Sequence, residues 1–334
     1  MDPISQGVAG AVVSGANQPK KHTNLALLCG AFAGISADID VFISSPTDPL
    51  LFLEYHRQFT HSLVFIPFGA AICSALLWHW VRQHIDLRRL YLSCLLGFAS
   101  HGLLDTCTTY GTQLFWPFSE ERFAWNIISI IDPLFTLPLC ILTWLAYKQK
   151  SRIWLRAALA WMIIYLSLGL IQNLRATHAG EQLAATRQHH PAQIASKPSF
   201  ANLLIWKTVY QWEDHFYVDA VRVGLEEKTY AGSRAAKIDV GQHFPSLERN
   251  QQQTIDIERF RKFSNGYLAW RPLHPDRVID VRYSMLPNEI NPLWYIQVNQ
   301  DRPDQHVKFI TKERANSEIL ARFWSMIQGD SLTD

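Results

Sequence analysis

The chain has 334 residues, 48% of them hydrophobic, and its 31 Lys and Arg residues nearly balance its 29 Asp and Glu residues. The net charge of +2 argues against a nucleic-acid-binding protein, which would need Lys and Arg clustered on one face. We therefore expect no nucleic-acid partner. All five cysteines lie before residue 141 without C-x-x-C spacing, so we expect small buried hydrophobic side chains and not a disulfide framework.

The composition changes sharply along the chain. Residues from about 25 to 174 are dominated by Leu, Ile, Ala, Phe and Trp, whereas residues from 178 onward alternate charged and apolar side chains. We predict a membrane-embedded domain at 1–177, a linker rich in Ala, Gln, His and Pro at 178–200, and a soluble domain at 201–334. The first residues lack the basic start of a secretory signal, so we expect the N-terminus to be retained.

Five apolar segments follow one another in the first half. About 20 apolar residues are needed to cross a bilayer, and the segments at 61–81, 127–147 and 153–171 meet this length. The segments at 25–43 and 90–104 are marginal because each carries polar residues at one end. We predict an α-helical integral membrane protein with about five spans. Buried core helices of a soluble protein are the alternative.

Lys and Arg in the short loops predict the orientation of these spans. They concentrate before the first span, between the second and third, and between the fourth and fifth: Lys20, Lys21, Arg82, Arg88, Arg89, Lys148, Lys150 and Arg152. We expect these loops in the cytoplasm. An odd number of crossings then makes the C-terminal domain extracytoplasmic, on the same face as the loops at 44–60 and 106–126.

The segments at 206–223, 278–285 and 293–298 alternate polar residues with aromatic and β-branched ones, as strands do. The segment at 311–330 has helical spacing and a Gly near its end. We predict a soluble α+β domain, mostly β, with a closing helix. Its histidines lack metal-ligand spacing, so we interpret them as surface residues: His215, His243, His274 and His306.

Ionisable residues gather at one end of the predicted spans. Asp38 and Asp40 end the first, His56 and His61 stand at the start of the second, and His101 and Asp105 end the third. An ionisable residue in a span costs about 2.5–3.5 kcal/mol. Six such residues close together therefore imply that they compensate one another's charge or bind an ion. We predict that the six bind a divalent metal ion, for which N and O ligands favour Zn²⁺, Mn²⁺ or Fe²⁺. For any one histidine, an interfacial hydrogen-bonding role is the alternative.

Two further aspartates precede proline. Asp132 precedes Pro133 and Asp48 precedes Pro49, and an aspartate N-cap followed by proline is a favoured helix start. We interpret both aspartates as caps.

Several motifs occur in the order found in a known family. They are D-P-I-S-Q-G at 2–7, G-I-S-A-D-I-D at 34–40, E-Y-H-R-Q-F-T-H-S at 54–62, S-H-G-L-L-D at 100–105 and I-I-D-P-L-F-T-L-P-L at 130–139. The chain resembles the membrane-bound metal-dependent hydrolase family, the LexA-regulated inner-membrane hydrolases of the YdjM type. The resemblance covers about residues 1–150 and implies a multi-pass protein of the cell inner membrane.

The resemblance also assigns family motifs to positions of this chain. The P-D-x-D motif falls on Asp38 and Asp40, H-R-G-x-T-H-S on 56–62, and S-H-x-x-x-D on 100–105, with Ala37 and Gln58 in place of the family's proline and glycine. Family members usually open with D-P-x-T-H-G, and this chain has Gln6 where that histidine stands. Gln binds borderline metals less well than imidazole, so this departure weakens the implied ligand set.

Together, the residues and the resemblance predict metal-assisted hydrolysis at the lipid–water boundary, of an ester or phosphoester bond in a membrane lipid or lipid-linked substrate. Zinc is the favoured ion. Asp40 either bridges a second ion or acts as general base, and Arg57 either binds an anionic group such as a lipid phosphate or faces the headgroups. The alternative is a non-catalytic membrane protein whose outer domain has a partner-binding or regulatory role. A transporter would need polar residues near the middle of the bilayer.

Overall fold

The computed structural model describes residues 1–311 and 316–331 and contains two compact units. The helical unit consists of Met1–Ile43, Tyr55–Leu170 and Phe200–Asn202. The sheet unit consists of Ser44–Glu54, Ile171–Ser199 and the described residues from Leu203 onward. The loop Ser44–Glu54 therefore belongs by its contacts to the sheet unit, although the residues on both sides of it are helical-unit residues.

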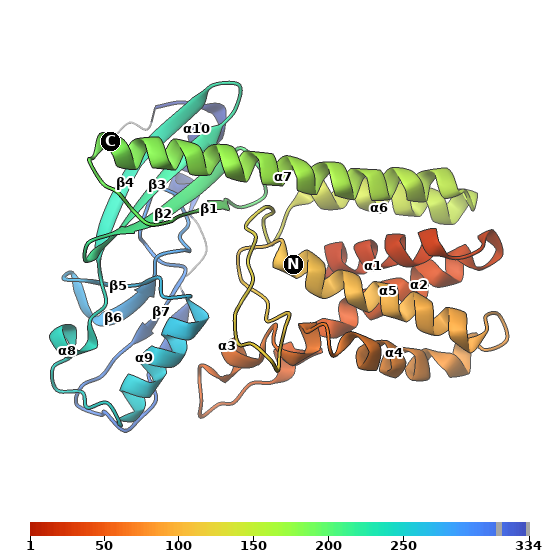
Figure 1. Ribbon diagram of the computed structural model, residues 1–334, viewed down its shortest axis with the longest axis horizontal. Helices are drawn as coiled ribbons and strands as arrows, with labels where there is room; N and C mark the ends of the chain where they lie inside the picture. The colour runs from red at the N-terminus through yellow and green to blue at the C-terminus, as the bar shows by residue number, and fades with distance from the viewer. Residues whose placement is uncertain (312–315, 332–334) are drawn as a thin grey trace. The chain divides into compact units, whose positions relative to one another are not determined.

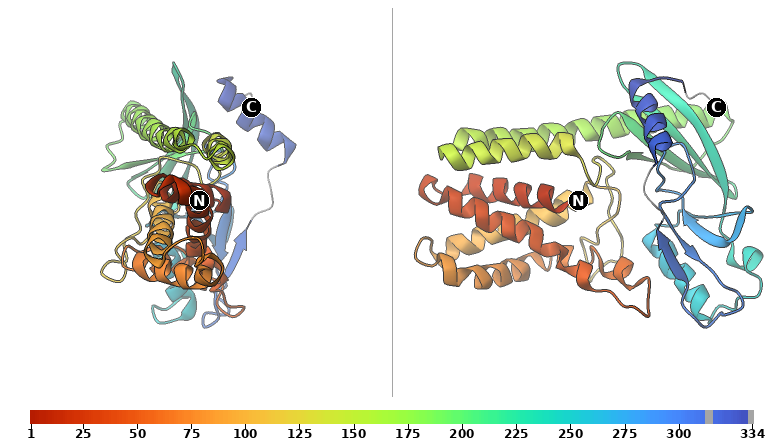
Figure 2. Two further views of the ribbon diagram at one scale, coloured as in Figure 1. Left: turned by 90° about the vertical axis from the view of Figure 1, so that its right-hand side faces the viewer. Right: turned by 180° about the vertical axis from the view of Figure 1, so that it is seen from behind.

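The helical unit is a bundle in which α1 packs against α2, α5 and α6, and α5 also packs against α2 and α4 (Figure 1, Figure 2). Its elements are α1 (Pro3–Asn17), η1 (Lys20–His22), α2 (Thr23–Ser36), η2 (Ala37–Phe42), η3 (Phe59–His61), α4 (Ile66–Val81), α5 (Leu87–Thr106), α6 (Pro133–Gln149) and the first part of α7 (Arg152–Thr186). Four of the five cysteines are buried, and all five are free thiols, as expected.

Aspartate and proline start two of these helices. Asp2 caps α1 by accepting a hydrogen bond from the Ser5 N–H, and Pro3 follows it. Asp132 caps α6 by accepting from the N–H groups of Leu134 and Phe135, which confirms the predicted capping role. The Tyr165 hydroxyl of α7 also donates to Asp132, at 2.8 Å.

Helices α2 and α5 approach closely enough for their backbones to touch. A Cβ atom added to Gly97 would lie 2.4 Å from the carbonyl oxygen of Gly30. Small residues allow this approach, as they do between helices in membranes. The same approach brings His101 of α5 to the carbonyl oxygen of Gly34 on α2, 2.5 Å from its Nδ1.

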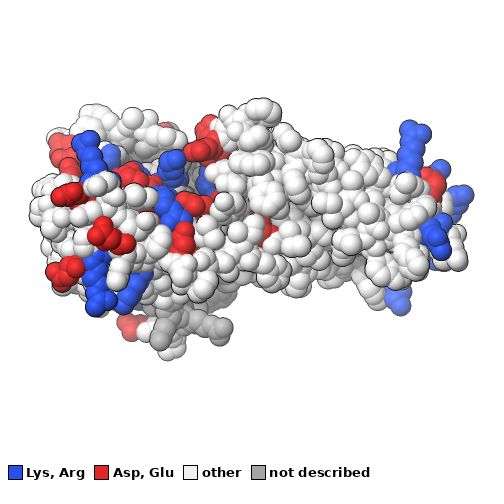
Figure 3. All heavy atoms as spheres, turned by 90° about the horizontal axis from the view of Figure 1, so that it is seen from below, with Lys and Arg blue, Asp and Glu red and all other residues white. Residues whose placement is uncertain are grey.

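The basic turns lie together at one end of the bundle. Gln18, between α1 and α2, donates from Nε2 to the carbonyl oxygen of Arg89, and its own carbonyl oxygen accepts from the Arg152 guanidinium. Figure 3 shows Lys and Arg gathered at this end and a largely uncharged face along the helices. Since α5 rises about 1.5 Å per residue over its 20 residues, Asp105 near its last turn lies at the opposite end.

Two helical segments are long and apolar enough to cross a membrane, Lys20–Phe42 and Arg152–Thr186. A third is added if Leu51–His61 and Ile66–Val81, bent by 84°, form one broken span. Among the described residues, the expected count of about five is therefore not supported. Helix α6 has only 17 residues, and α5 carries two arginines in its first turn and an ionisable pair near its last.

The sheet unit is built on an eight-stranded antiparallel sheet whose strands lie in sequence order. The strands are β1 (Ile194–Pro198), β2 (Ile205–Trp212), β3 (His215–Val223), β4 (Glu227–Lys237), β5 (Leu268–Arg271), β6 (His274–Asp280), β7 (Trp294–Gln297) and β8 (Lys308–Thr311). The helices α3 (Leu51–Tyr55), α8 (Val240–His243), α9 (Gln252–Phe263) and α10 (Ser317–Gln328) complete the set. This confirms the prediction of a mostly β domain.

Helix α10 confirms the predicted closing helix. Asn316 caps it, Gly329 ends it in the left-handed conformation, and Met326 packs with Ile205 and Tyr230 of the sheet. Residues 312–315 of the predicted helical segment lie outside the described residues.

The stretch 178–200, which we expected to be a linker, is structured instead. Helix α7 continues to Thr186, and β1 pairs with β2 in the register Ile194↔Tyr210. The alanines of residues 179–185 have the highest helix propensity of any residue, so the polar composition of this stretch does not interrupt the helix.

Candidate metal centre

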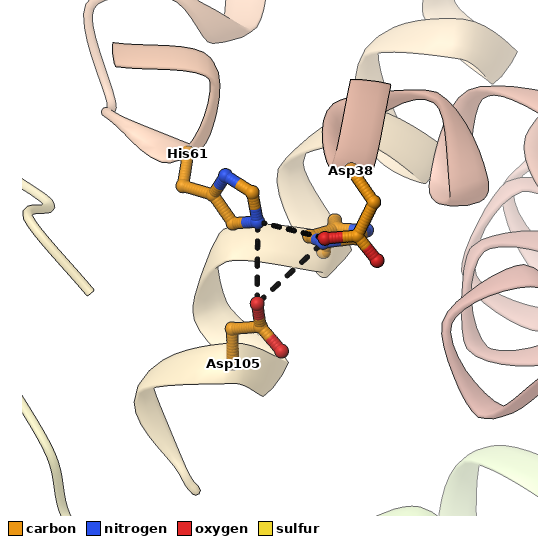
Figure 4. A group of neighbouring side chains, drawn as sticks. Asp38, His61 and Asp105 are labelled. Atoms are coloured by element: carbon orange, nitrogen blue, oxygen red, sulfur yellow. Dashed lines mark ion pairs between the residues drawn. The ribbon is translucent and has the colours of Figure 1, made fainter. Parts of the chain in front are cut away.

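Four side chains from three elements converge at the end of the bundle away from the basic turns. Asp38 lies on η2, His61 on η3, and His101 and Asp105 on α5. Asp38 Oδ1 is 3.4 Å from His61 Nε2 and 3.2 Å from His101 Nε2. Asp105 Oδ2 is 3.2 Å from His61 Nε2 and 3.6 Å from His101 Nε2. Figure 4 shows Asp38, His61 and Asp105 pointing toward one another.

These separations match the edges of a small tetrahedron. Zinc bonds to N and O of about 2.0–2.2 Å give ligand–ligand edges of about 3.3–3.6 Å in tetrahedral geometry. The four ligand atoms all lie within 4.8 Å of one another. One ion of this size therefore fits among them, and the donor set suits it.

Hydrogen bonds hold both imidazole rings by the nitrogen that faces away from the cluster. The Nδ1–H of His101 donates to the carbonyl oxygen of Gly34, which can only accept. The Nδ1 atom of His61 lies 2.9 Å from Thr60 Oγ1 and 3.2 Å from Asp40 Oδ2. A carbonyl or carboxylate on the far nitrogen is the usual support of a metal-binding histidine. Both Nε2 atoms have no hydrogen-bond partner among the described residues, and both rings are buried.

Asp105 is contacted from its other sides by donors. Arg57 Nε lies 3.0 Å from Asp105 Oδ2, and Gln6 Nε2 donates to Asp105 Oδ1 at 2.8 Å. The α-amino group of Met1 also contacts Oδ1. These groups orient the carboxylate, whose Oδ2 remains the atom directed at the two histidines.

Asp40 and His56 lie beside this cluster. Asp40 is fully buried and accepts the Arg57 N–H at 2.9 Å and the Thr60 hydroxyl at 2.7 Å on Oδ2, while His56 Nδ1 lies 2.9 Å from Oδ1. Asp40 thus orients the two histidines of the sequence motif. Asp38, Asp40 and His56 also form a second group of possible ligand atoms within 4.8 Å of one another. The structure therefore brings all six predicted metal residues together, in two adjoining groups.

Arg57 does not take the headgroup-facing role that was one of the two considered from the sequence. Its side chain is 3% exposed, so it does not face lipid headgroups. Its guanidinium donates to Thr108 Oγ1 at 2.8 Å and lies over the Tyr110 ring. With Asp105 and Thr108 as partners, this guanidinium supports the cluster from within the protein.

Three supporting residues were not identified from the sequence as parts of the site. Gln6, noted there only for replacing a histidine, is fully buried and directs Asp105, and its Oε1 has no partner among the described residues. Thr60 and Gly34 hold the two histidines. Both lie within the family motifs at 54–62 and 34–40, so the sequence could have marked them as site residues. Their hydrogen bonds to the histidines depend on the fold and could not be read from the sequence.

Comparison with known proteins gives a family match over the helical half. Residues 1–176 match the family described as YdjM inner membrane protein. The chain is 33% identical over 109 residues to the uncharacterized protein YfhP of Bacillus subtilis (strain 168), covering 32% of this chain and 33% of that protein. It is 39% identical over 79 residues to the inner membrane protein YbcI of Escherichia coli (strain K12), covering 22% of this chain and 44% of that protein. The matched segments thus span less than half of each relative. No solved structure gives a significant match.

Proposed function

We propose that this chain, which belongs to the YdjM inner membrane protein family, binds a divalent metal ion through Asp38, His61, His101 and Asp105. The observation that carries the proposal is the convergence of two carboxylate oxygens and two imidazole Nε2 atoms at 3.2–3.6 Å. Carboxylate and imidazole groups in a site this buried are stabilised by a cation that they share. Two N and two O ligands suit Zn²⁺, with Mn²⁺ or Fe²⁺ as alternatives.

We further propose that the centre hydrolyses an ester or phosphoester bond of a lipid or lipid-linked substrate. When bound, the ion supplies a Lewis acid that polarises the substrate oxygen and activates water. The side chains of Asp38 and His56 are each 19% exposed, whereas those of His61, His101 and Asp105 are 0% exposed. Substrate therefore approaches from the side of Asp38 and His56.

We assign proton transfer to His56. Asp40 Oδ1 holds its Nδ1, which leaves Nε2 of this partly exposed ring to take or give a proton. The burial of Asp40 and the donors on both its oxygens favour an orienting role for it over that of general base.

The membrane setting of the proposal follows from charge. The basic turns lie at the end of the bundle opposite the cluster, and loops rich in Lys and Arg stay in the cytoplasm. We therefore place the cluster at the outer face of the inner membrane, in a multi-pass protein with an extracytoplasmic sheet unit.

The test is metal analysis of the full chain purified in detergent. We expect close to one equivalent of Zn²⁺ in the wild type and a large loss in the His61→Ala, His101→Ala double variant. The His79→Ala, His84→Ala double variant is the matched control, because it removes two exposed histidines of the same unit. Equal substoichiometric metal in all three proteins contradicts the proposal. If the protein binds metal but cleaves no lipid ester or phosphoester in a substrate panel, the proposed metal site stands and the proposed hydrolase activity is wrong.

A further inference from the structure

The loop Ser44–Glu54 connects two of the three elements that carry the candidate ligands, η2 and η3. It follows η2, which bears Asp38, and it precedes His56 and His61. Its own contacts are with the sheet unit. Anything in the sheet unit that holds this loop therefore restrains, through the chain itself, the distance between Asp38 and His61.

One arginine of the sheet unit holds the loop at two points. Arg259, on α9, donates from Nη1 to Asp48 Oδ1 at 3.0 Å and from Nη2 to Asp48 Oδ2 at 2.8 Å. Its Nε donates to Glu54 Oε1 at 2.6 Å. A two-point guanidinium–carboxylate pair fixes direction as well as distance. Glu54 stands two residues before His56 in the chain.

The guanidinium is itself held from behind. Asp256, which is fully buried, accepts from Arg259 Nη1 at 2.9 Å and from the Val307 N–H at 3.0 Å, and His306 Nδ1 lies 2.9 Å from it. Arg259 is only 16% exposed. Burial opposes ionisation of Asp48, but Arg259 outweighs it and holds the pKa of that carboxyl below its usual value.

Apolar packing reinforces the same loop. The Phe52 ring meets the Phe309 ring of β8 edge-on, with centroids 5.4 Å apart. Leu50 and Leu53 are buried. The Asp48 carboxylate also accepts the Leu50 N–H at 3.0 Å, but α3 begins at Leu51, so Asp48 stabilises the turn before the helix and is not its N-cap as predicted. The loop is thus an ordered part of the sheet unit.

We propose that Arg259 is a positioning residue for the metal centre. By fixing Asp48 and Glu54 it restrains the segment that joins Asp38 to His56 and His61, so the sheet unit contributes to metal affinity without supplying a ligand. This inference rests on the proposed metal site. Losing an outer support of a metal ligand typically lowers metal affinity about 10–100-fold.

The test compares Arg259→Ala with Arg261→Ala in the full chain purified in detergent. Arg261 lies on the same helix and pairs with Glu258, three residues before it on that helix, so it is a matched control. Zn²⁺ affinity is measured by competition with a chelator, and amide hydrogen exchange is followed in residues 44–54. We expect Arg259→Ala to weaken Zn²⁺ binding at least about tenfold and to speed exchange in the loop. Arg259→Lys keeps the charge but not the two-point geometry, so we expect its Zn²⁺ affinity and exchange rate to lie between those of the wild type and Arg259→Ala. Arg261→Ala changes neither quantity.

The outcomes separate the two proposals. If the wild type binds Zn²⁺ and Arg259→Ala binds it equally, the positioning role is overturned and the metal site stands. If the wild type itself binds no Zn²⁺, the proposed function fails, and the positioning role fails with it. A purely structural Arg259 would lower thermal stability without changing the affinity of the folded protein. Should Arg259→Ala not fold, the Asp48→Asn, Glu54→Gln double variant removes the same pairs while leaving Arg259 on Asp256, and equal Zn²⁺ affinity there overturns the role.

Discussion

His61 Nε2 lies 3.2 Å from Asp105 Oδ2, although neither atom has a hydrogen-bond partner among the described residues. The Nδ1 side of His61 is held by Thr60 and Asp40, which leaves Nε2 as the ring atom directed at the carboxylate. A metal ion between Nε2 and this carboxylate would be bound by both, while Arg57, 3.0 Å from Oδ2, supports the carboxylate from its other side. This pair, from η3 and α5, is therefore the core of the proposed metal centre.

Replacing Asp105 by Asn tests the charge of that pair. The amide is nearly the same size but is neutral, so we expect Zn²⁺ affinity to fall more than about tenfold, the effect of losing even an outer support of a ligand. Asp132→Asn is the control, because Asp132 is also buried and Asn is an equally good N-cap. Chelator competition measures both. Unchanged affinity in Asp105→Asn would remove Asp105 from the ligand set.

Gly102 allows the backbone of η3 to reach α5. A Cβ atom at this position would lie 2.6 Å from the carbonyl oxygen of His61. Because a backbone atom cannot rotate away, Gly102→Ala must displace His61, and we expect a loss of about 1–3 kcal/mol in the free energy of unfolding together with weaker Zn²⁺ binding. Gly241→Ala meets nothing closer than 3.5 Å and serves as the control. Wild-type stability and affinity in Gly102→Ala would show that the helices separate at little cost.

Much of the cluster could be predicted from the sequence because its residues stand at the ends of apolar segments. His101 and Asp105 share a helix face by spacing alone, and the basic turns placed their end of α5 opposite Gln18 and Arg89. The cap at Asp132 followed from the proline after it. These inferences use local periodicity and charge, which the sequence records directly.

What could not be predicted depends on local direction and on distant contacts. Asp38 and Asp40 look alike in the sequence, but the turn of η2 directs Asp38 at His101 and Asp40 at His56 and Thr60. Arg57 has φ of 62°, an uncommon backbone conformation, and its side chain lies against Asp105. The hold of Arg259 on the loop joins residues far apart in the chain, and no spacing rule reveals it.

Asp40→Asn tests whether this carboxylate orients the histidines. Asp40 holds Nδ1 of His56 and of His61, so loss of its charge should let both rings turn. We expect Zn²⁺ affinity to fall about 10–100-fold while the folded state persists. Glu121→Gln neutralises an exposed carboxylate in the same unit, and we expect it to leave Zn²⁺ affinity unchanged. A complete loss of Zn²⁺ would instead make Asp40 a direct ligand.

A buried lysine of the sheet unit predicts how stability depends on pH. Lys207 is 4% exposed and donates from Nζ to Ser284 Oγ at 2.7 Å and to the Glu289 carbonyl oxygen at 2.8 Å. Burial lowers the pKa of Lys207 to about 7, although Asp280 and Glu289 act to raise it. Burial likewise lowers the pKa of Lys197.

The unfolded chain keeps the Lys207 proton up to a pKa of about 10.4, so between pH 7 and 10 it binds more protons than the folded chain. The free energy of unfolding of the sheet unit should therefore rise with pH, by up to about 1.4 kcal/mol per pH unit for this group. Lys207→Met should flatten that slope, with the remainder due to Lys197. Lys308→Met, an exposed lysine of β8, should keep it. Urea unfolding followed by circular dichroism at several pH values measures the slopes, and equal slopes for wild type and Lys207→Met would show that Lys207 stays charged in the fold.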